Sequence, residues 1–304
     1  MSLHLPPDYR GQEVHGNPMH APDSTSVRTE VGSIRDARSR RPAASLIKDG
    51  YAIGAFVRAV CGIWVDAVNE DAVNTIYSIK GESRVGRPIS TLLSTSDFVG
   101  LIDPDAVPPA LRSIVLDAEE LEARFGSLGF MRAPIRRDAA AALPPSTVSQ
   151  TPDGTYWLQN YIPSALDSAH AVVNALVEQG VAVPAATSMN ISGQSEIVDQ
   201  EEGIAFCNAF GIPLFLADPN DKGRVRGSFP IISLDRAGIT LQREGQFPGY
   251  LVQYLLGCEV DMSRAVRPKY PVVQTHSERW ASRIPPRRLH DEIVACLDGP
   301  EGAI

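Results

Sequence analysis

The feature that most constrains the fold of this chain is an octet near its middle, A-T-S-M-N-I-S-G at residues 186–193. A short apolar run at residues 181–186 leads into it, bounded by Gly180 and then by polar residues, which is typical of a buried β-strand. A strand that ends in hydroxyls, an amide and a glycine sets small hydrogen-bonding groups at the edge of a sheet, where α/β proteins commonly bind ligands. From these residues alone, an ordinary strand followed by a Ser/Asn/Gly turn is the alternative.

The composition is that of a globular protein. The chain has 304 residues, of which 43% are hydrophobic and 21% charged, so it can bury a sizeable core in one large domain or two small ones. Its net charge of -8 argues against a broadly basic surface for nucleic acid and leaves only a local basic cleft for RNA. No apolar run reaches the roughly 18 residues that span a membrane, so we expect no membrane partner.

Cysteine usage excludes two kinds of site. The four cysteines, Cys61, Cys207, Cys258 and Cys296, lie far apart without a C-x-x-C pair. We therefore expect neither a zinc site nor a disulfide framework. Reduced thiols are the rule in the cytoplasm, which is the location we expect.

The two ends of the chain differ from its middle in composition. Residues 1–42 are rich in His, Pro, Ser and Arg, which predicts a mobile N-terminal arm, with order beginning near Ala43. The arm carries a basic cluster that is either solvated or in contact with an acidic partner, comprising Arg35, Arg38, Arg40 and Arg41. We expect the main domain at residues 43–258 and a C-terminal extension at residues 259–304.

Apolar periodicity and turn residues predict alternating strands and helices within the main domain. Expected strands cover residues 50–57, 60–65, 88–93, 129–134, 155–162, 181–186, 213–217, 229–234 and 239–242. Expected helices cover residues 69–80, 118–124, 165–179, 200–210 and 249–256, with one more at 288–297 in the extension.

A second polar stretch, K-G-E-S-R-V-G-R-P-I-S at residues 80–90, follows the first of these helices. It places Lys80, Arg84 and Arg87 on a loop punctuated by glycines. Three such cations can gather phosphate or carboxylate groups, and arginine offers a bidentate fork for them. A solvated basic loop is the alternative.

Taken together, these stretches resemble the YrdC-like family of threonylcarbamoyl-adenylate synthases, whose fold also occurs inside carbamoyltransferases. That family has a helix followed by K-G-R-P-x-x-K-P-L and, much later, a strand ending in T-S-A-N-x-S-G. Residues 80–89 and 187–193 are similar to these motifs, and I-T-L-Q-R-E-G at residues 239–245 is similar to the family's I-L-R-x-G strand end. The resemblance covers roughly residues 45–258. It implies an α/β fold with a twisted, mixed or largely antiparallel sheet, flanking helices and a concave ligand-binding surface.

The resemblance also implies a reaction and a set of site residues. The family joins ATP, bicarbonate and threonine into threonylcarbamoyl-AMP, a nucleotidyl transfer that releases pyrophosphate and serves the modification of an adenosine in tRNA. Mg²⁺ is expected wherever ATP is handled, although no acidic pair identifies its ligands. By position, the catalytic cations are Lys80 and Arg84. The nucleotide-binding residues are Lys80, Arg87, Thr187, Ser188, Asn190, Ser192 and Arg243. The acceptor substrate is expected near Arg58, Cys61 and Tyr161.

The chain departs from the family where the acceptor substrate is expected. The family's P-T-D/E-T-x-Y-G-L falls on residues 56–63, where only Gly62 is retained. Arg58 and apolar groups replace its acid and hydroxyls. Cys61 stands in place of its tyrosine as a packed thiol or a nucleophile, and no histidine lies nearby in sequence to activate it.

Further departures affect the expected charges. Glu82 takes the place of the arginine in K-G-R, and Arg84 follows two residues later. The Ser-Thr pair of the family's P-S-T-I-V-D strand becomes Phe229-Pro230. The arginine of R-x-P becomes Tyr161, with Arg132 as an alternative placement. A pocket without its polar partners should lose discrimination for a hydroxylated amino acid.

Three functions remain open from the sequence. The first is a diverged enzyme that makes or uses an acyl- or carbamoyl-adenylate with an unidentified small-molecule acceptor. The second is a threonylcarbamoyl-AMP synthase with unusual residues. The third is a non-catalytic module that binds a nucleotide or RNA, which the acidic net charge disfavours for RNA.

Overall fold

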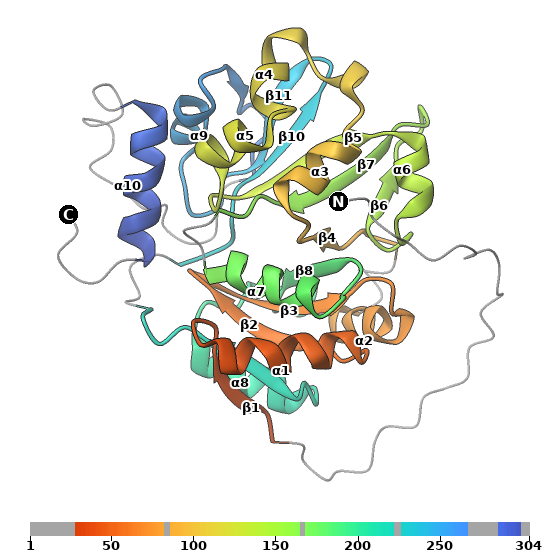
Figure 1. Ribbon diagram of the computed structural model, residues 1–304, viewed down its shortest axis with the longest axis vertical. Coiled ribbons are helices and arrows are strands. Elements are labelled where there is room, and N and C mark those ends of the chain that lie inside the picture. Colours follow the sequence, from red (N-terminus) through yellow and green to blue (C-terminus); the bar gives the residue numbers. More distant parts are fainter. Residues whose placement is uncertain (1–27, 82–85, 165–167, 222–225, 267–284, 299–304) are drawn as a thin grey trace.

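The predicted strands pair into one twisted, mixed sheet whose two faces are flanked by helices (Figure 1). The computed structural model describes residues 28–81, 86–164, 168–221, 226–266 and 285–298. Within these residues the strands are β1 Glu30–Ser33, β2 Ile53–Val57, β3 Val60–Asp66, β4 Ser90–Thr91, β5 Phe130–Ile135, β6 Val148–Gln150, β7 Tyr156–Tyr161, β8 Pro184–Ser188, β9 Leu214–Ala217, β10 Ile231–Asp235, β11 Gly238–Arg243 and β12 Val260–Asp261.

The described residues contain all six predicted helices and four further α-helices, α1, α3, α4 and α6, that were not predicted. They are α1 Ala37–Lys48, α2 Glu70–Lys80, α3 Thr95–Leu101, α4 Arg112–Val115, α5 Ala118–Phe125, α6 Arg137–Ala142, α7 Ser168–Glu178, α8 Gln200–Ala209, α9 Gly249–Leu256 and α10 Pro286–Asp298, with short 3₁₀ helices η2 at Pro104–Ala106 and η3 at Pro109–Leu111. The helices expected at residues 69–80, 118–124, 165–179, 200–210, 249–256 and 288–297 are confirmed as α2, α5, α7, α8, α9 and α10.

The strand order is β1-β9-β2-β3-β8-β4-β7-β5-β10-β11-β12, and β6 pairs with β7. The central strands β2, β3, β8 and β4 run antiparallel to one another. The pairs β1–β9, β9–β2, β4–β7 and β5–β10 are parallel. The predicted α/β class with a mixed sheet is therefore confirmed, and β8, which carries the octet, lies near the middle of the sheet.

Side chains that alternate along the strands divide into two cores, one on each face. In β3, Cys61, Ile63 and Val65 belong to the core beneath α2, α8 and the helices α3, α5, α9 and α10. Val60 and Trp64 belong to the opposite core, which is closed by α1 and α7. Helices α1 and α7 contact each other and lie in front of β3 and β8 (Figure 1). We call this side the α1/α7 face.

The α1/α7 face continues onto strands whose side chains are less covered. On β5 and β7, the side chains of Arg132, Trp157 and Gln159 are only half-buried. The Arg132 guanidinium carbon lies 4.9 Å from the centre of the Trp157 ring, which is a cation–π distance. Coverage by α7 therefore ends near the junction of β8, β4 and β7, which is where the candidate site lies.

The prediction that residues up to 42 form a mobile arm is wrong for the part that the structure describes. β1 pairs in parallel with β9, and α1 begins at Ala37, where the Asp36 carboxylate caps it by accepting from the Arg38 N–H. Arg35, assigned to a solvated or partner-binding cluster, donates to both carboxylate oxygens of Asp218 at 2.7 and 2.9 Å. The sequence missed this because β1 and its partner strand are distant along the chain. Residues 1–27 lie outside the described residues.

The start of the C-terminal extension is also part of the sheet. β12 pairs with β11 directly after the predicted boundary at residue 259. In α10, the ring of the buried His290 places Nε2 2.6 Å from the Gly126 carbonyl oxygen, and Leu289 and Ile293 join the core. The segment therefore closes one end of the domain.

Two strand boundaries near the site differ from the predicted ones. β8 begins only at Pro184 and includes Thr187 and Ser188, two residues beyond the predicted strand end at residue 186. β4 is limited to Ser90–Thr91 instead of residues 88–93. The first shift places the hydroxyls of the octet on the rigid strand itself.

A buried amide joins β7 to the short β4. The side chain of Asn160, fully buried, accepts from Thr91 Oγ1 and the Leu93 N–H, both at 2.8 Å. It donates to the carbonyl oxygens of Leu93 and Tyr161 at 3.1 and 2.6 Å. The side-chain amide of Asn160 thus uses all of its hydrogen-bonding capacity within the core. Its bond to the Tyr161 carbonyl oxygen fixes the backbone at Tyr161.

Candidate functional site

The polar centre of the octet is organised by one lysine. Helix α2 starts with Asn69, whose side chain accepts from the Ala72 N–H at 2.9 Å, and it ends at Gly81, so that Lys80 is its last residue. The Lys80 ammonium is buried and donates to the Ser188 carbonyl oxygen and to Asn190 Oδ1, with Ser188 Oγ at 3.5 Å. The positive charge of Lys80 therefore lies against Ser188, the last residue of β8.

The same centre is closed by contacts among the octet residues. Ser188 Oγ donates to Asn190 Oδ1 at 2.8 Å, and the Asn190 amide donates to the Gln194 carbonyl oxygen at 2.9 Å. The Ser192 N–H donates to the Lys80 carbonyl oxygen at 3.2 Å. The structure thus brings together Lys80, Ser188, Asn190 and Ser192. Because the Lys80 ammonium already binds protein oxygens, it would act on a ligand through its charge or through the side chains of Ser188 and Asn190.

Beside this centre lies a cavity of about 270 Å³ on the α1/α7 face. Its walls come from β2, β3, β4, β5, β7, β8, β10, β11 and the start of α7. Small residues, Gly62, Ala169 and Ala186, leave the space open. Among the predicted site residues, those that line it are Cys61, Tyr161, Thr187, Ser188 and Arg243.

One wall of the cavity is aromatic. Phe130, Tyr161 and Phe229 contact one another with ring centres 5.2 to 6.0 Å apart and with tilted or edge-on geometry. Such arrangements stabilise aromatic groups beyond the burial of their area. Tyr161 and Phe229 are the residues found where the resembling family has an arginine and a serine, so this apolar wall replaces groups that were expected to be polar.

A cation, Arg243, lines the cavity beside this wall. Arg243 Nε and Nη2 donate to the Phe229 carbonyl oxygen at 3.1 and 2.8 Å. Within the described part of the chain, Nη1 has no hydrogen-bond partner. Burial lowers the pKa of Arg243, and the negative charge of Glu196 acts in the opposite direction. Arg243 therefore lines the cavity with a guanidinium that two of its nitrogens hold in place.

The negative charge of Glu196 partly offsets the positive charge of Arg243. Its Oε1 accepts from the N–H and the hydroxyl of Ser228 at 3.1 and 2.7 Å. Burial acts to raise the pKa of Glu196, but the hydrogen bonds from Ser228 and the charge of Arg243 lower it below its ordinary value. The carboxylate is therefore ionised and fixes the backbone just before Phe229.

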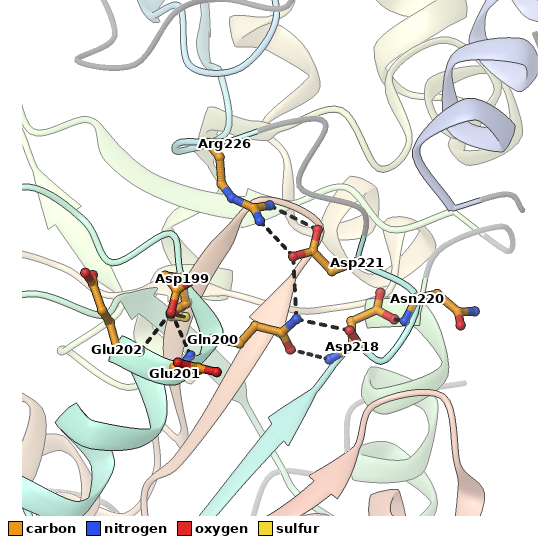
Figure 2. A network of polar contacts seen from close by, with 9 residues as sticks. Asp199, Gln200, Glu201, Glu202, Asp218, Asn220, Asp221 and Arg226 are labelled. Atoms are coloured by element: carbon orange, nitrogen blue, oxygen red, sulfur yellow. Dashed lines mark hydrogen bonds and ion pairs between the residues drawn. The ribbon is translucent and has the colours of Figure 1, made fainter. Parts of the chain in front are cut away.

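A polar network joins the start of α8 to Asp218, Asp221 and Arg226 (Figure 2). The side chain of Gln200, at the start of α8, accepts from the Asp218 N–H at 2.7 Å and donates to its carbonyl oxygen at 3.1 Å. Asp221 forms a bidentate ion pair with Arg226 at 2.9 and 3.0 Å, and the Arg226 guanidinium carbon lies 5.7 Å from the centre of the Phe56 ring. The network thus ties Asp218 to the start of α8 and pairs Asp221 with Arg226.

Two residues predicted near the acceptor do not present their side chains to the cavity. Arg58 is buried at the β2–β3 turn, with a left-handed backbone φ of 57°, and its Nη1 donates to the Ser127 carbonyl oxygen at 2.9 Å. Cys61 lines the cavity only through its place on β3, because its sulfur faces α8 and lies 3.4 Å from the Asp199 carbonyl oxygen. Burial raises the pKa of the Cys61 thiol, as does the nearby Cys207. Both side chains serve the packing of the core.

Of the two remaining predicted cations, the structure describes only Arg87. Arg87 is exposed and is not one of the residues that line the cavity, although the adjacent Pro88 is. Arg84 and Glu82 lie outside the described residues. Their roles remain predictions.

Sequence reasoning missed three groups that line or support the cavity. Phe130 was assigned only to a strand, and the pair of Ser90 and Gln159, joined by a 2.6 Å hydrogen bond from Gln159 Nε2, was not singled out. Glu196, which supports Ser228, was not considered. The pairing of Phe130 with Tyr161 across β5 and β7 follows from strand register, which one sequence does not supply.

Neither a metal cluster nor a membrane span is found in the described part. No group of three or more His, Cys, Asp or Glu side chains there is arranged to hold a metal ion. None of the helices described is both long and apolar enough to cross a bilayer.

Comparison with solved structures identifies the architecture. P. abyssi Sua5 complexed with L-threonine matches with a TM-score of 0.55 and 20% identity over 80% of this chain and 68% of that one. E. coli YciO matches with a TM-score of 0.51 and 13% identity over 71% of this chain and 94% of that one. The fold is YrdC-like. No model of a protein family matches the sequence, and no curated protein matches it.

Two further matches show how far this YrdC-like likeness extends. A variant of P. abyssi Sua5 matches at 19% identity, and this chain spans 65% of its length. HypF in its phosphate- and nucleotide-bound form matches with a TM-score of 0.50 at 16% identity, over 68% of this chain and 29% of that one. At these identities the likeness is one of fold, and the low values agree with a divergent YrdC-like sequence.

Proposed function

We propose that this chain is an ATP-using enzyme that makes or uses an acyl- or carbamoyl-adenylate. The observation that carries the proposal is the convergence of Lys80, Ser188 and Asn190 at the end of β8, next to a cavity that Ser188 shares with Arg243. Cations and small hydrogen-bonding groups on rigid strand ends are what adenylyl transfer requires, since its catalysis is mostly positioning and charge stabilisation.

The proposed chemistry is transfer of an adenylyl group to a carboxylate or carbamate. An oxygen of that group attacks the α-phosphorus of ATP, the bond to the bridging oxygen breaks, and pyrophosphate leaves with the electron pair. The Arg243 guanidinium would hydrogen-bond an anionic group, while the Lys80 charge would stabilise negative charge beside β8. Mg²⁺ is proposed to accompany ATP, with phosphates supplying its ligands because the described carboxylates form no cluster.

The structural neighbours support a nucleotide and a small acceptor as partners. HypF is found in a nucleotide-bound form and P. abyssi Sua5 with L-threonine, both on this fold. The threonine complex favours threonylcarbamoyl-AMP synthesis, in the service of tRNA modification, as the second candidate. The apolar wall formed by Tyr161 and Phe229 disfavours it, because a hydroxylated substrate would find fewer polar partners there.

ATP binding measured by calorimetry tests the proposal. Asn190→Ala and Lys80→Met should each weaken binding by about 1 kcal/mol or more, because each removes a group that orders the end of β8. Lys48→Met is the matched control, since Lys48 also ends a helix but is exposed. Thermal unfolding verifies that each variant is folded. No ATP binding by the folded wild type, or equal weakening by all three substitutions, would overturn the proposal.

Pyrophosphate release separates the two candidates. Release that requires only threonine and bicarbonate would establish threonylcarbamoyl-AMP synthesis and would contradict a different acceptor. Release that requires another carboxylate or amine, with threonine inactive, would establish the diverged enzyme.

A further inference from the structure

The cavity has two chemically distinct ends. Its apolar part is formed by the three rings of the aromatic wall, by Trp64 and by Leu92. Tyr161, Phe229 and Trp64 are each at most 5% exposed, so these surfaces are already desolvated. A polar side chain placed against them would lose hydrogen bonds to water without replacement, whereas an apolar body would not.

The cavity also offers a place for one negative charge. Arg243 lines it, with two guanidinium nitrogens fixed on the Phe229 carbonyl oxygen and with no hydrogen-bond partner for Nη1 among the described residues. A guanidinium held in this way is a preorganised receptor for a carboxylate. Glu196 offsets part of its charge, but that carboxylate is already occupied by two donors from Ser228.

The size of the cavity limits what it holds. A cavity of about 150 Å³ with apolar walls accommodates a benzene ring. The volume of about 270 Å³ therefore accepts one ring or branched chain together with a carboxyl group.

We propose that the cavity binds a small apolar carboxylate, with its ring or branched chain against Phe130, Tyr161 and Phe229 and its carboxylate on Arg243. Its assignment as the co-substrate of ATP rests on the function proposed above. The ligand class differs from threonine in having no need for a hydroxyl partner. The polar pair of Ser90 and Gln159 adds hydrogen-bonding groups on a third side.

Calorimetry with three probes, in the absence of ATP, tests the ligand class. Phenylacetate supplies a ring and a carboxylate, phenylacetamide supplies the same ring without the charge, and L-threonine is polar. The full-length protein should bind phenylacetate about tenfold more tightly than the other two, since a charge-assisted hydrogen bond and an aromatic contact each contribute at this level. Binding of L-threonine equal to or tighter than that of phenylacetate, or no binding of phenylacetate, would overturn the inference.

Substitutions locate the two ends of the site. Arg243→Gln should abolish the preference for phenylacetate over phenylacetamide. Phe229→Ser should weaken both about fivefold, and Phe130→Ser, at a half-exposed ring, provides the same readout if the first variant does not fold. Phe210→Ser removes a ring from an aromatic pair on α8 outside the cavity and should change nothing. Survival of the preference in Arg243→Gln would contradict the inference.

The ATP titration distinguishes the two proposals. ATP binding without the phenylacetate preference leaves the enzyme proposal standing and overturns the apolar ligand. The phenylacetate preference without ATP binding overturns the co-substrate role and the enzyme proposal, while the ligand class of the cavity stands.

Discussion

Asn160 offers a sharp test of how the floor of the site is held together. Asn160→Ala removes an amide that bonds to Thr91, to both backbone groups of Leu93 and to the Tyr161 carbonyl oxygen. Thr91 Oγ1 still has the Gln159 carbonyl oxygen as a partner, at 3.2 Å. The three buried groups that lose a partner are therefore the Leu93 N–H and the carbonyl oxygens of Leu93 and Tyr161. A buried group left unpaired costs about 1–3 kcal/mol, less for a carbonyl than for an N–H, which gives a loss of about 4 kcal/mol.

Urea unfolding, followed by circular dichroism, measures this loss against a neighbour of the same chemistry. The matched control is Gln159→Ala, which removes a half-buried amide with one side-chain hydrogen bond, to Ser90 Oγ, and whose partner can turn to water. The control should lose less than about 1 kcal/mol. If the two variants unfold within about 1 kcal/mol of each other, buried amide pairing does not determine the stability of this region. The slope of each transition must be unchanged for the comparison to apply.

Three further predictions concern other parts of the fold. Gly245→Ala should lower the stability of the protein in thermal unfolding by several kcal/mol, because the new Cβ would lie 2.3 Å from the Phe229 backbone at a φ of 66°. The control Gly257→Ala has a similar φ of 68° but lies beside a flexible arginine, so it should cost only about 1 kcal/mol. Equal losses of stability in the two variants would contradict this reasoning. Asp218→Asn should lower stability in urea by about 1–3 kcal/mol through the buried end of its ion pair, and an unchanged midpoint would show that β1 is not held there. Burial raises the pKa of Cys207 from 9.0 to about 12, so the stability this thiol contributes is complete below pH 9 and lost as the pH rises toward 12. Iodoacetamide labelling of Cys207 in the native protein at pH 8, followed by mass spectrometry of its peptide, should therefore be slow, and rapid labelling of Cys207 would refute the burial.

Local signals predicted most of the elements. The start of α2 at Asn69 and its end at Gly81 were evident from capping and glycine preferences, because both signals act within a few residues. Helix α9 has the bounds expected from its apolar pattern. β1 was missed because it is short and gains its stability from pairing with β9, and no local pattern encodes a partner so far along the chain.

The candidate site was predicted only in part, because its motifs are local in the sequence and the packing around them is not. The motif resemblance implied that Lys80 and the octet bind one nucleotide, and the structure brings Lys80 into contact with Ser188 and Asn190. That the Lys80 ammonium would be buried against Ser188 and Asn190 did not follow from charge count, since its environment depends on the angle at which α2 meets β8. The aromatic wall was visible only as the loss of polar residues at Tyr161 and Phe229. Its third member, Phe130, joins through strand register.

The pairing of β1 with β9 has a consequence for the order in which the protein is assembled. Arg35 and Asp218 are 183 residues apart, so the partner of the first strand is made long after the strand itself. At the roughly 5–20 residues per second of translation, β1 waits on the order of 10–40 s on the ribosome with its backbone groups unpaired. During this interval β2 is a sheet edge as well, and unpaired edges are where chains associate wrongly. The pairing of β1 with β9 is therefore a late, long-range step, and slow folding is expected from this connectivity alone.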